Sequence, residues 1–185
     1  MKVRNVHERE MRGSMQQLSE IVKTYGSKND RMYPFERWPK MQLEGPEGPP
    51  IVGRIGNRGA AQFVMTHYEN GERIRYSWKF LKPVGFDGHH HGEAQELGNG
   101  KILFRSVVDM NTRGLKATLL WLFVMRPLHD AVVEDSFDKV ERELGSSPKI
   151  RKWSPWVKFL RRLKRRNSVE YQRLDREQLD RYADV

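Results

Sequence analysis

The sequence predicts an α+β domain in which an antiparallel sheet packs against one long helix. Residues 73–80 alternate between apolar and polar side chains, as in a strand with one buried face. Two turn signals, Asn70-Gly71 and Gly98-Asn99-Gly100, separate strand-like segments, and residues 114–145 carry apolar side chains at helical spacing. A half-apolar sheet and an amphipathic helix bury both faces by packing together, and a curved sheet would leave a pocket between them.

The first part of the chain predicts one strand and one helix. Residues 2–10 are expected to form the strand. A helix ending near Gly26 is expected next, because four apolar side chains have helical spacing: Met15, Leu18, Ile21 and Val22. The segment 41–62 is rich in Gly and Pro and predicts short extended pieces joined by turns.

Two hairpins follow. Segments 62–68 and 73–80 meet at Glu69-Asn70-Gly71, and segments 87–97 and 101–110 meet across Gly98-Asn99-Gly100. Alternation places one set of side chains on a common face of each second strand: Ile74, Tyr76, Trp78 and Phe80, then Ile102, Phe104, Ser106, Val108 and Met110.

The segment 114–145 is predicted to be one helix with polar residues on its buried face. At 100° per residue a single stripe collects Leu115, Leu119, Leu122, Val133, Phe137, Val140 and Leu144. Arg126 lies within this stripe and His129 at its edge, and burying an unpaired guanidinium is costly. We therefore expect the helix to cover a cavity. The alternative is that Arg126 pairs with Asp130 or Asp109, while Pro127 kinks the helix and rotates the stripe.

Composition indicates one domain with an appendage, and we place the boundary between residues 2–145 and 146–185. The 185-residue chain has no cysteine, which excludes disulfides and thiolate chemistry and agrees with a cytoplasmic location. The N-terminal stretch lacks the apolar core of a secretory signal. No nucleophile elbow, phosphate-binding loop or dinucleotide fingerprint is present, so no cofactor is expected.

Basic charge is concentrated in the appendage. Residues 149–166 hold nine of the 34 Lys and Arg residues and no acid, so elsewhere 25 basic residues face 24 acidic ones. Ser154-Pro155 predicts a helix start, and Trp156, Phe159, Leu160 and Leu163 then form a narrow apolar stripe. This pattern is typical of a helix on an anionic membrane surface, and the residues expected there are Trp156, Lys158, Phe159, Arg161, Arg162, Lys164 and Arg165. The alternative is a helix docked on its own domain; nucleic acid is not expected, because no recognition motif accompanies the charge.

Several local strings resemble the START-related helix-grip superfamily, which includes polyketide cyclases, aromatases and lipid-transfer domains. They are Arg37-Trp38-Pro39, the string from Tyr68 to Tyr76, Gly88-His89-His90, and Arg126-Pro127-Leu128-His129-Asp130-Ala131 followed by Glu134-Asp135. The resemblance implies a curved seven-stranded antiparallel sheet wrapped on a long C-terminal helix around an internal cavity. It covers residues 2–145. Gly92 and Ala94 depart from the bulkier residues expected there, which predicts a larger pocket or a bulge.

In such a fold the inner sheet face is also the pocket wall, and we expect a mostly apolar ligand with one or two polar groups. The residues predicted to contact it are Tyr76, Trp78, His90, Phe104, Ser106, Met110, Leu122, Arg126 and His129. The predicted function is binding or transport of a small hydrophobic molecule such as a lipid, polyketide or isoprenoid, with an anionic membrane surface as a partner.

Two alternatives remain open at this stage. The same cavity could serve a cyclase, aromatase or dehydratase in which His90, His129 or Arg126 polarises a carbonyl or moves a proton. A protein-interaction module would instead have a filled core and a large exposed apolar patch. His89 and His91 share a strand face with a nearby carboxylate, Glu93, and these are metal-ligand residue types. We interpret them as solvated and expect no metal, because no third ligand with suitable spacing accompanies the two histidines.

Overall fold

A seven-stranded antiparallel sheet forms the body of the protein, in the order β1-β7-β6-β5-β4-β3-β2. The computed structural model describes residues 1–45, 48–58, 61–148 and 151–166. Residues 165 and 166 are described by backbone alone. The strands are β1 Lys2–Arg12, β2 Gln42–Leu43, β3 Ile55–Arg58, β4 Ala61–Asn70, β5 Ile74–Lys82, β6 Phe86–Gly98 and β7 Lys101–Thr112. The helices are α1 Met15–Val22, α2 Leu115–Leu120, the π-helix η1 Trp121–Met125, α3 Arg126–Glu143 and α4 Pro155–Arg166.

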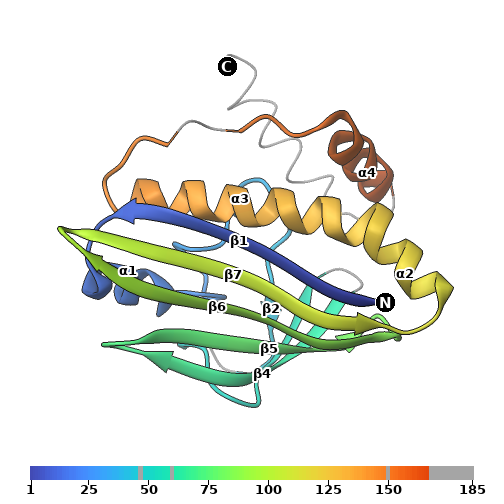
Figure 1. The fold of residues 1–185 in the computed structure, drawn as a ribbon, viewed down its shortest axis with the longest axis horizontal. Coiled ribbons are helices and arrows are strands. Elements are labelled where there is room, and N and C mark those ends of the chain that lie inside the picture. Colours follow the sequence, from blue (N-terminus) through green and yellow to red (C-terminus); the bar gives the residue numbers. More distant parts are fainter. Residues whose placement is uncertain (46–47, 59–60, 149–150, 167–185) are drawn as a thin grey trace.

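The predicted fold class is confirmed. The sheet curves beneath the long helix, and β4 and β5 turn away from β1 and β7 (Figure 1). Register shifts between Gln62 and Phe63 and between Met65 and His67 interrupt the β4–β5 ladder, and such irregularities bend a strand and increase its twist. Both predicted hairpins form, and Asn99 adopts φ 51° in the β6–β7 turn.

The segment 114–145 runs continuously but is not one regular α-helix. Five residues, Trp121–Met125, form a π-helical turn between α2 and α3. A π turn uses i→i+5 hydrogen bonds and so contains more residues than an α turn, which shifts the phase of the apolar stripe by about one residue. Pro127 lies in the first turn of α3 and has no N–H to donate, so the regular α-helical hydrogen-bond pattern is interrupted at this point.

This phase shift overturns the stripe predicted for a regular helix. Beyond the π turn, Val133, Phe137 and Val140 are buried as expected. Before the π turn and at its start, Leu115, Leu119 and Leu122 are exposed, and the buried positions are Ala117 and Trp121. The alternative in which the stripe rotates near Pro127 therefore describes this helix better than the straight one.

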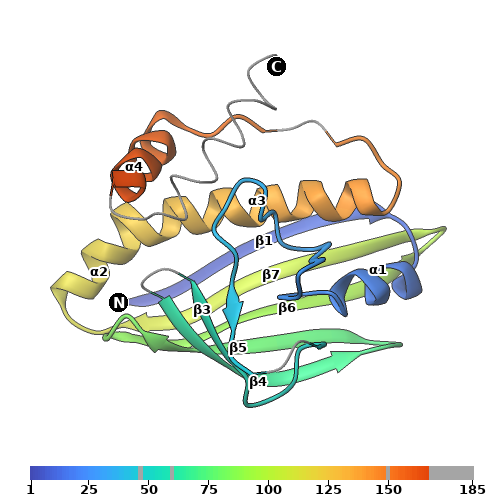
Figure 2. The ribbon, with the colours of Figure 1, turned by 180° about the vertical axis from the view of Figure 1, so that it is seen from behind.

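Helix α4 packs against the domain rather than extending away from it (Figure 1). Val157 and Leu160 are buried in the main core together with residues of α3 and the α1–β2 connection. Figure 2 shows that connection rising from α1 to meet α3. Asp135 of α3 accepts hydrogen bonds from the indoles of Trp38 (2.6 Å) and Trp153 (2.9 Å), which joins the three segments.

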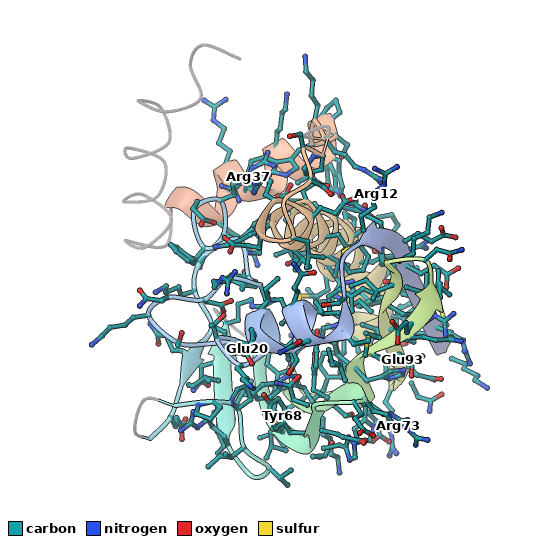
Figure 3. All side chains as sticks on the ribbon, turned by 90° about the vertical axis from the view of Figure 1, so that its left-hand side faces the viewer. Arg12, Glu20, Arg37, Tyr68, Arg73 and Glu93 are labelled. Atoms are coloured by element: carbon teal, nitrogen blue, oxygen red, sulfur yellow. The ribbon has the colours of Figure 1, made fainter. Side chains whose placement is uncertain are left out.

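The long helix with α4 and the β4–β5 hairpin lie on opposite sides of the molecule. Figure 3 looks along the long helix and shows Arg37 on the helix side, near α4, whereas Tyr68 and Arg73 lie at the opposite side on the β4–β5 hairpin. Arg37 pairs with Asp135 (2.5 Å) and lies over the ring of Trp153 at 4.2 Å. The helix side thus carries a buried ionic and aromatic cluster that fixes α4.

Candidate functional site: an apolar pocket between sheet and helix

A pocket of about 530 Å³ lies between the curved sheet and the long helix. Its sheet wall consists of Arg58, Ala61, Phe63, Trp78, Phe80 and His90. Its helix wall consists of Trp121, Met125, Leu128, His129 and Val132, and the α1–β2 connection adds Tyr25, Tyr33, Trp38, Pro39 and Met41. Leu163 and Lys164 of α4 complete the lining, and because Leu163 is 45% exposed the pocket reaches the surface beside α4. The volume is typical of small-molecule sites.

Two side chains on this wall have polar atoms without hydrogen-bond partners. Trp78 is 1% exposed, and its indole N–H has no acceptor. Both ring nitrogens of His129 are buried and lack hydrogen-bond partners, and the closest carboxylate oxygen, Asp130 Oδ1, is 3.8 Å from Nδ1. An unsatisfied buried donor costs about 1–3 kcal/mol, so a bound molecule that accepted from it would gain that free energy.

His90 lies beside His129 but is better satisfied. The two rings meet edge to face with centroids 5.2 Å apart, and His90 Nε2 shares a hydrogen bond of 2.9 Å with Ser106 Oγ. Burial, reinforced by the neighbouring His129, lowers the pKa of His90 well below the usual histidine range. Burial likewise lowers the pKa of His129. Both rings are therefore neutral near pH 7 and offer one donor and one acceptor each.

Of the nine residues predicted to contact ligand, Trp78, His90 and His129 lie on the pocket wall, and the structure places the others elsewhere. Phe104, Ser106 and Met110 are buried on β7 outside the lining: Phe104 packs on Phe137 with centroids 5.5 Å apart, and Ser106 holds His90. The structure therefore places these three outside the pocket lining, because strand alternation identifies the inner face but not which part of it borders the pocket.

The Tyr76 ring occupies the space beside Gly92. Tyr76 is opposite Gly92 in the β5–β6 ladder, and a Cβ atom on Gly92 would lie 2.2 Å from Tyr76 Cζ. The space expected to enlarge the pocket is thus filled by the tyrosine ring, and the prediction of a larger cavity at Gly92 is wrong. Tyr76 Oη lies 3.8 Å from Met32 Sδ, within the core.

Arg126 and Leu122 lie on the outer side of the helix. The Arg126 side chain is 54% exposed, and its Nε lies 3.7 Å from Asp130 Oδ2, as in the alternative pairing considered from the sequence. Both residues border a second, outer groove of about 480 Å³ between the long helix and residues 151–157. The π turn accounts for their displacement, so the expectation that Arg126 reaches the internal pocket is wrong.

Most of the lining residues are not among the predicted contacts, and four of them, Arg58, Trp121, Met125 and Lys164, come from segments that the sequence assigns to other roles. Arg58 comes from a turn-rich segment, and Trp121 and Met125 belong to the π turn. Lys164 was assigned to the membrane-facing side of α4, yet it lines the pocket. Its sequence does hold a signal: Lys164 is four residues from the buried Leu160, on the same helix face.

On the side away from the pocket, the long helix binds β1 through ion pairs. His7 donates to Glu134 (2.9 Å) and Asp130 (3.0 Å), and Arg9 binds Glu134 (2.6 Å) and Asp138 (2.5 Å). Burial lowers the pKa of His7, but the two carboxylates outweigh it and raise that pKa to about 9. Within the described ranges His7, His129 and Asp130 form the one triad with metal-ligand atoms close together, and a protonated His7 favours an ion-pair network there over a metal centre.

The predicted membrane-facing residues divide into two faces of α4. Trp156, Phe159, Lys158 and Arg162 are exposed, and the Trp156 and Phe159 rings stack with centroids 5.3 Å apart. Arg161 is 6% exposed, lies 4.0 Å above the Trp153 ring and donates to the carbonyl of Arg37, so its assignment to the exposed face is wrong. The Arg165 side chain lies outside the described residues. None of the described helices is long and apolar enough to span a bilayer.

Comparison with solved structures identifies the class of fold. Norcoclaurine synthase from Thalictrum flavum, solved with dopamine and hydroxybenzaldehyde, matches 80% of this chain and 91% of its own at 14% identity and a TM-score of 0.58. A hypothetical protein from Helicobacter pylori covers 77% and 88% at 9% identity and a TM-score of 0.58. CalU16 from Micromonospora echinospora covers 86% and 81% at 14% identity and a TM-score of 0.52.

These matches show that the chain has a helix-grip fold, which it shares with norcoclaurine synthase and CalU16. No family model matches the sequence, and no curated protein matches it. The fold is thus shared by an enzyme whose structure was solved with dopamine and hydroxybenzaldehyde. Fold alone does not define an activity, which must be argued from the pocket.

Proposed function

We propose that this protein binds a small, mainly hydrophobic molecule of the lipid, polyketide or isoprenoid class in the pocket between sheet and helix. The carrying observation is the pocket itself: a volume of about 530 Å³, an aromatic and aliphatic lining, and a few polar atoms that include the unpartnered Trp78 Nε1. Burying apolar ligand surface against such a wall favours binding by roughly 25 cal/mol per Å².

Native mass spectrometry of freshly purified protein tests this proposal. We expect a co-purifying hydrophobic ligand, or uptake of an added apolar probe with quenching of Trp78 and Trp121 fluorescence. The variant Ala61→Phe adds a ring to the pocket wall and should reduce uptake, whereas Val84→Phe, at a position 92% exposed and outside the lining, should not. Failure of the parent protein to take up any apolar probe would count against the proposal.

The same proposal includes delivery at an anionic membrane surface. Apolar side chains are exposed on neighbouring parts of the long helix and α4: Leu119, Leu122, Phe123, Trp156, Phe159 and Leu163. Trp156 Nε1 donates to the carbonyl of Phe123 (2.8 Å), which joins the two parts into one surface. Lys158 and Arg162 flank it, and Leu163 connects it to the pocket. This is the composition of an interfacial helix.

Liposome co-sedimentation tests the membrane step. Binding should rise with the anionic lipid fraction, fall with ionic strength, and drop for Trp156→Ser/Phe159→Ser. Val84→Ser, which also removes an exposed apolar side chain, should bind as the parent does. These variants are sharper than truncation at residue 148, which would also remove the buried Val157 and Leu160. Unchanged sedimentation of the double variant would refute the membrane step.

One observation favours the enzyme as a second candidate. Two neutral imidazoles, His90 and His129, converge on the pocket, and His129 has both nitrogens available for proton transfer. If the protein is a cyclase or dehydratase, the ligand recovered from His129→Gln should differ from that of the parent in mass where water is lost, and in fragmentation pattern where a ring closes without loss of atoms. Identical ligands from both proteins would favour binding alone.

A further inference from the structure

The charged groups on the pocket wall are all of one sign. Arg58 and Lys164 line the pocket, and none of the described lining residues is Asp or Glu. The other titratable side chains there are tyrosines and the two histidines. A mostly apolar cavity whose described wall carries two cations and no acidic residue is suited to an anionic ligand group.

The two cations influence each other. Burial, and then the charge of Arg58, lowers the pKa of Lys164, so the ammonium group lies within electrostatic reach of the guanidinium. Both side chains are partly buried, and like charges repel more strongly where water is partly excluded than in open solvent. No described residue accepts a hydrogen bond from Lys164 Nζ or forms an ion pair with it. An anion bound here would therefore offset both the cost of burying the ammonium group and its repulsion from Arg58.

Hydrogen-bond donors extend this positive region along the wall. Arg58 donates to Tyr25 Oη (3.4 Å), the Tyr25 ring meets the Trp78 ring with centroids 6.1 Å apart, and the Trp78 N–H is buried without an acceptor. His90 is directly opposite Trp78 in the β5–β6 ladder. Cations and an unused N–H group therefore lie on the same side of the cavity, and Phe63, Phe80 and Leu128 provide an apolar remainder.

We propose that the ligand is an amphiphile whose polar end is a single anionic group such as a carboxylate, bound beside Arg58 and Lys164 with the Trp78 N–H as a donor. This inference rests on the proposed binding of a hydrophobic molecule in the same pocket. The anionic end faces the α4 side, where Lys164 stands beside the partly exposed Leu163, and the apolar chain extends toward Phe80 and Trp121.

Three monomeric ligands with the same twelve-carbon chain test the inference: dodecanoic acid, dodecanol and dodecylamine, titrated at pH 7.5 without vesicles. Displacement of a fluorescent apolar probe should show the acid binding at least tenfold more tightly than the alcohol and the amine binding most weakly. Lys164→Met retains the apolar stem and should reduce affinity for the acid several-fold while leaving affinity for the alcohol unchanged. Lys158→Met, on an exposed position of the same helix, should leave both unchanged.

The outcomes separate this inference from the function on which it depends. If acid and alcohol bind equally, or if Lys164→Met and Lys158→Met behave alike, the anionic subsite is overturned while the hydrophobic pocket stands. If none of the three ligands displaces the probe and no probe binds, the proposed function itself fails. Arg58→Met serves as a second variant, and circular dichroism of each variant distinguishes lost binding from lost folding.

Discussion

The long helix packs on the sheet in two different ways along its two sides. Toward β1, the polar groups are paired: His7 and Arg9 meet Asp130, Glu134 and Asp138 at 2.5–3.0 Å. Toward β5 and β6, Trp78 and His129 lack partners beside a cavity. Paired buried charges hold a helix in place, whereas unpaired buried donors leave hydrogen bonds that a bound molecule would complete. The β1 side therefore fixes the helix, and the pocket side is where we propose that ligand binds.

The largest expected effect is on the β1 side. Arg9→Met leaves Asp138, whose side chain is 4% exposed, without its guanidinium partner. Breaking a buried pair from one side typically costs about 3–5 kcal/mol, so urea unfolding should show a loss of that size. Arg105→Met is the matched control, because its pairs with Glu8 and Glu93 lie at the surface, with side chains 35–52% exposed, and surface pairs contribute about 0.2–1 kcal/mol. Equal losses of unfolding free energy in the two variants would contradict the structural role assigned to the β1 side.

The next effect follows from the raised pKa of His7. Its folded pKa of about 9 exceeds the ordinary value of 6.5, so its contribution to stability is fully present below pH 6.5 and is lost as pH rises through about 9. A shift of that size corresponds to about 3 kcal/mol. Unfolding measured from pH 6 to pH 10 should show the decline, and His7→Gln should flatten it. His67→Gln, at an exposed histidine, should retain the parent profile.

Much of the structural frame could be predicted from the sequence because it is encoded locally. Alternation over 73–80 and the turns at Asn70-Gly71 and Gly98-Asn99-Gly100 predicted both hairpins, since turn chemistry and strand period are properties of adjacent residues. Strings such as Arg37-Trp38-Pro39 indicated the fold, and the structure shows why they matter: the indole of Trp38 binds Asp135 in the middle of the long helix.

The pocket was less predictable because its boundaries depend on long-range geometry. The π turn changes the helix phase through its hydrogen bonds, and residue types hint at it only through Pro127. Arg126 therefore faces outward, against expectation. The filling of the space above Gly92 depends on the cross-strand register that sets Tyr76 opposite it. Arg58 and Lys164 come from segments read as turns and as a surface helix.

The third prediction tests where the core ends and the pocket begins. Gly92→Ala should destabilise the fold by about 1–3 kcal/mol, the usual cost of overpacking, because the new methyl group would meet the Tyr76 ring. Probe uptake should be unchanged, since neither residue lines the pocket. Adding Tyr76→Leu, which removes the ring, should recover part of the loss. Reduced uptake by a folded Gly92→Ala would show that the pocket extends to β6 at this point.

The smallest expected effect concerns α4, which takes part in both sides of the comparison. Arg161 lies over the rings of Trp38 (4.7 Å) and Trp153 (4.0 Å). Arg161→Met should cost about 1–2 kcal/mol, the range for a desolvated cation–π contact, and should loosen α4 before the sheet unfolds. Its neighbour Arg162 is exposed, so Arg162→Met should leave α4 docked. Limited trypsin digestion should cleave within α4 faster in the first variant.

Because Leu163 and Lys164 line the pocket, Arg161→Met should also release an anionic ligand faster. Faster cleavage without faster release would place the anionic group away from α4.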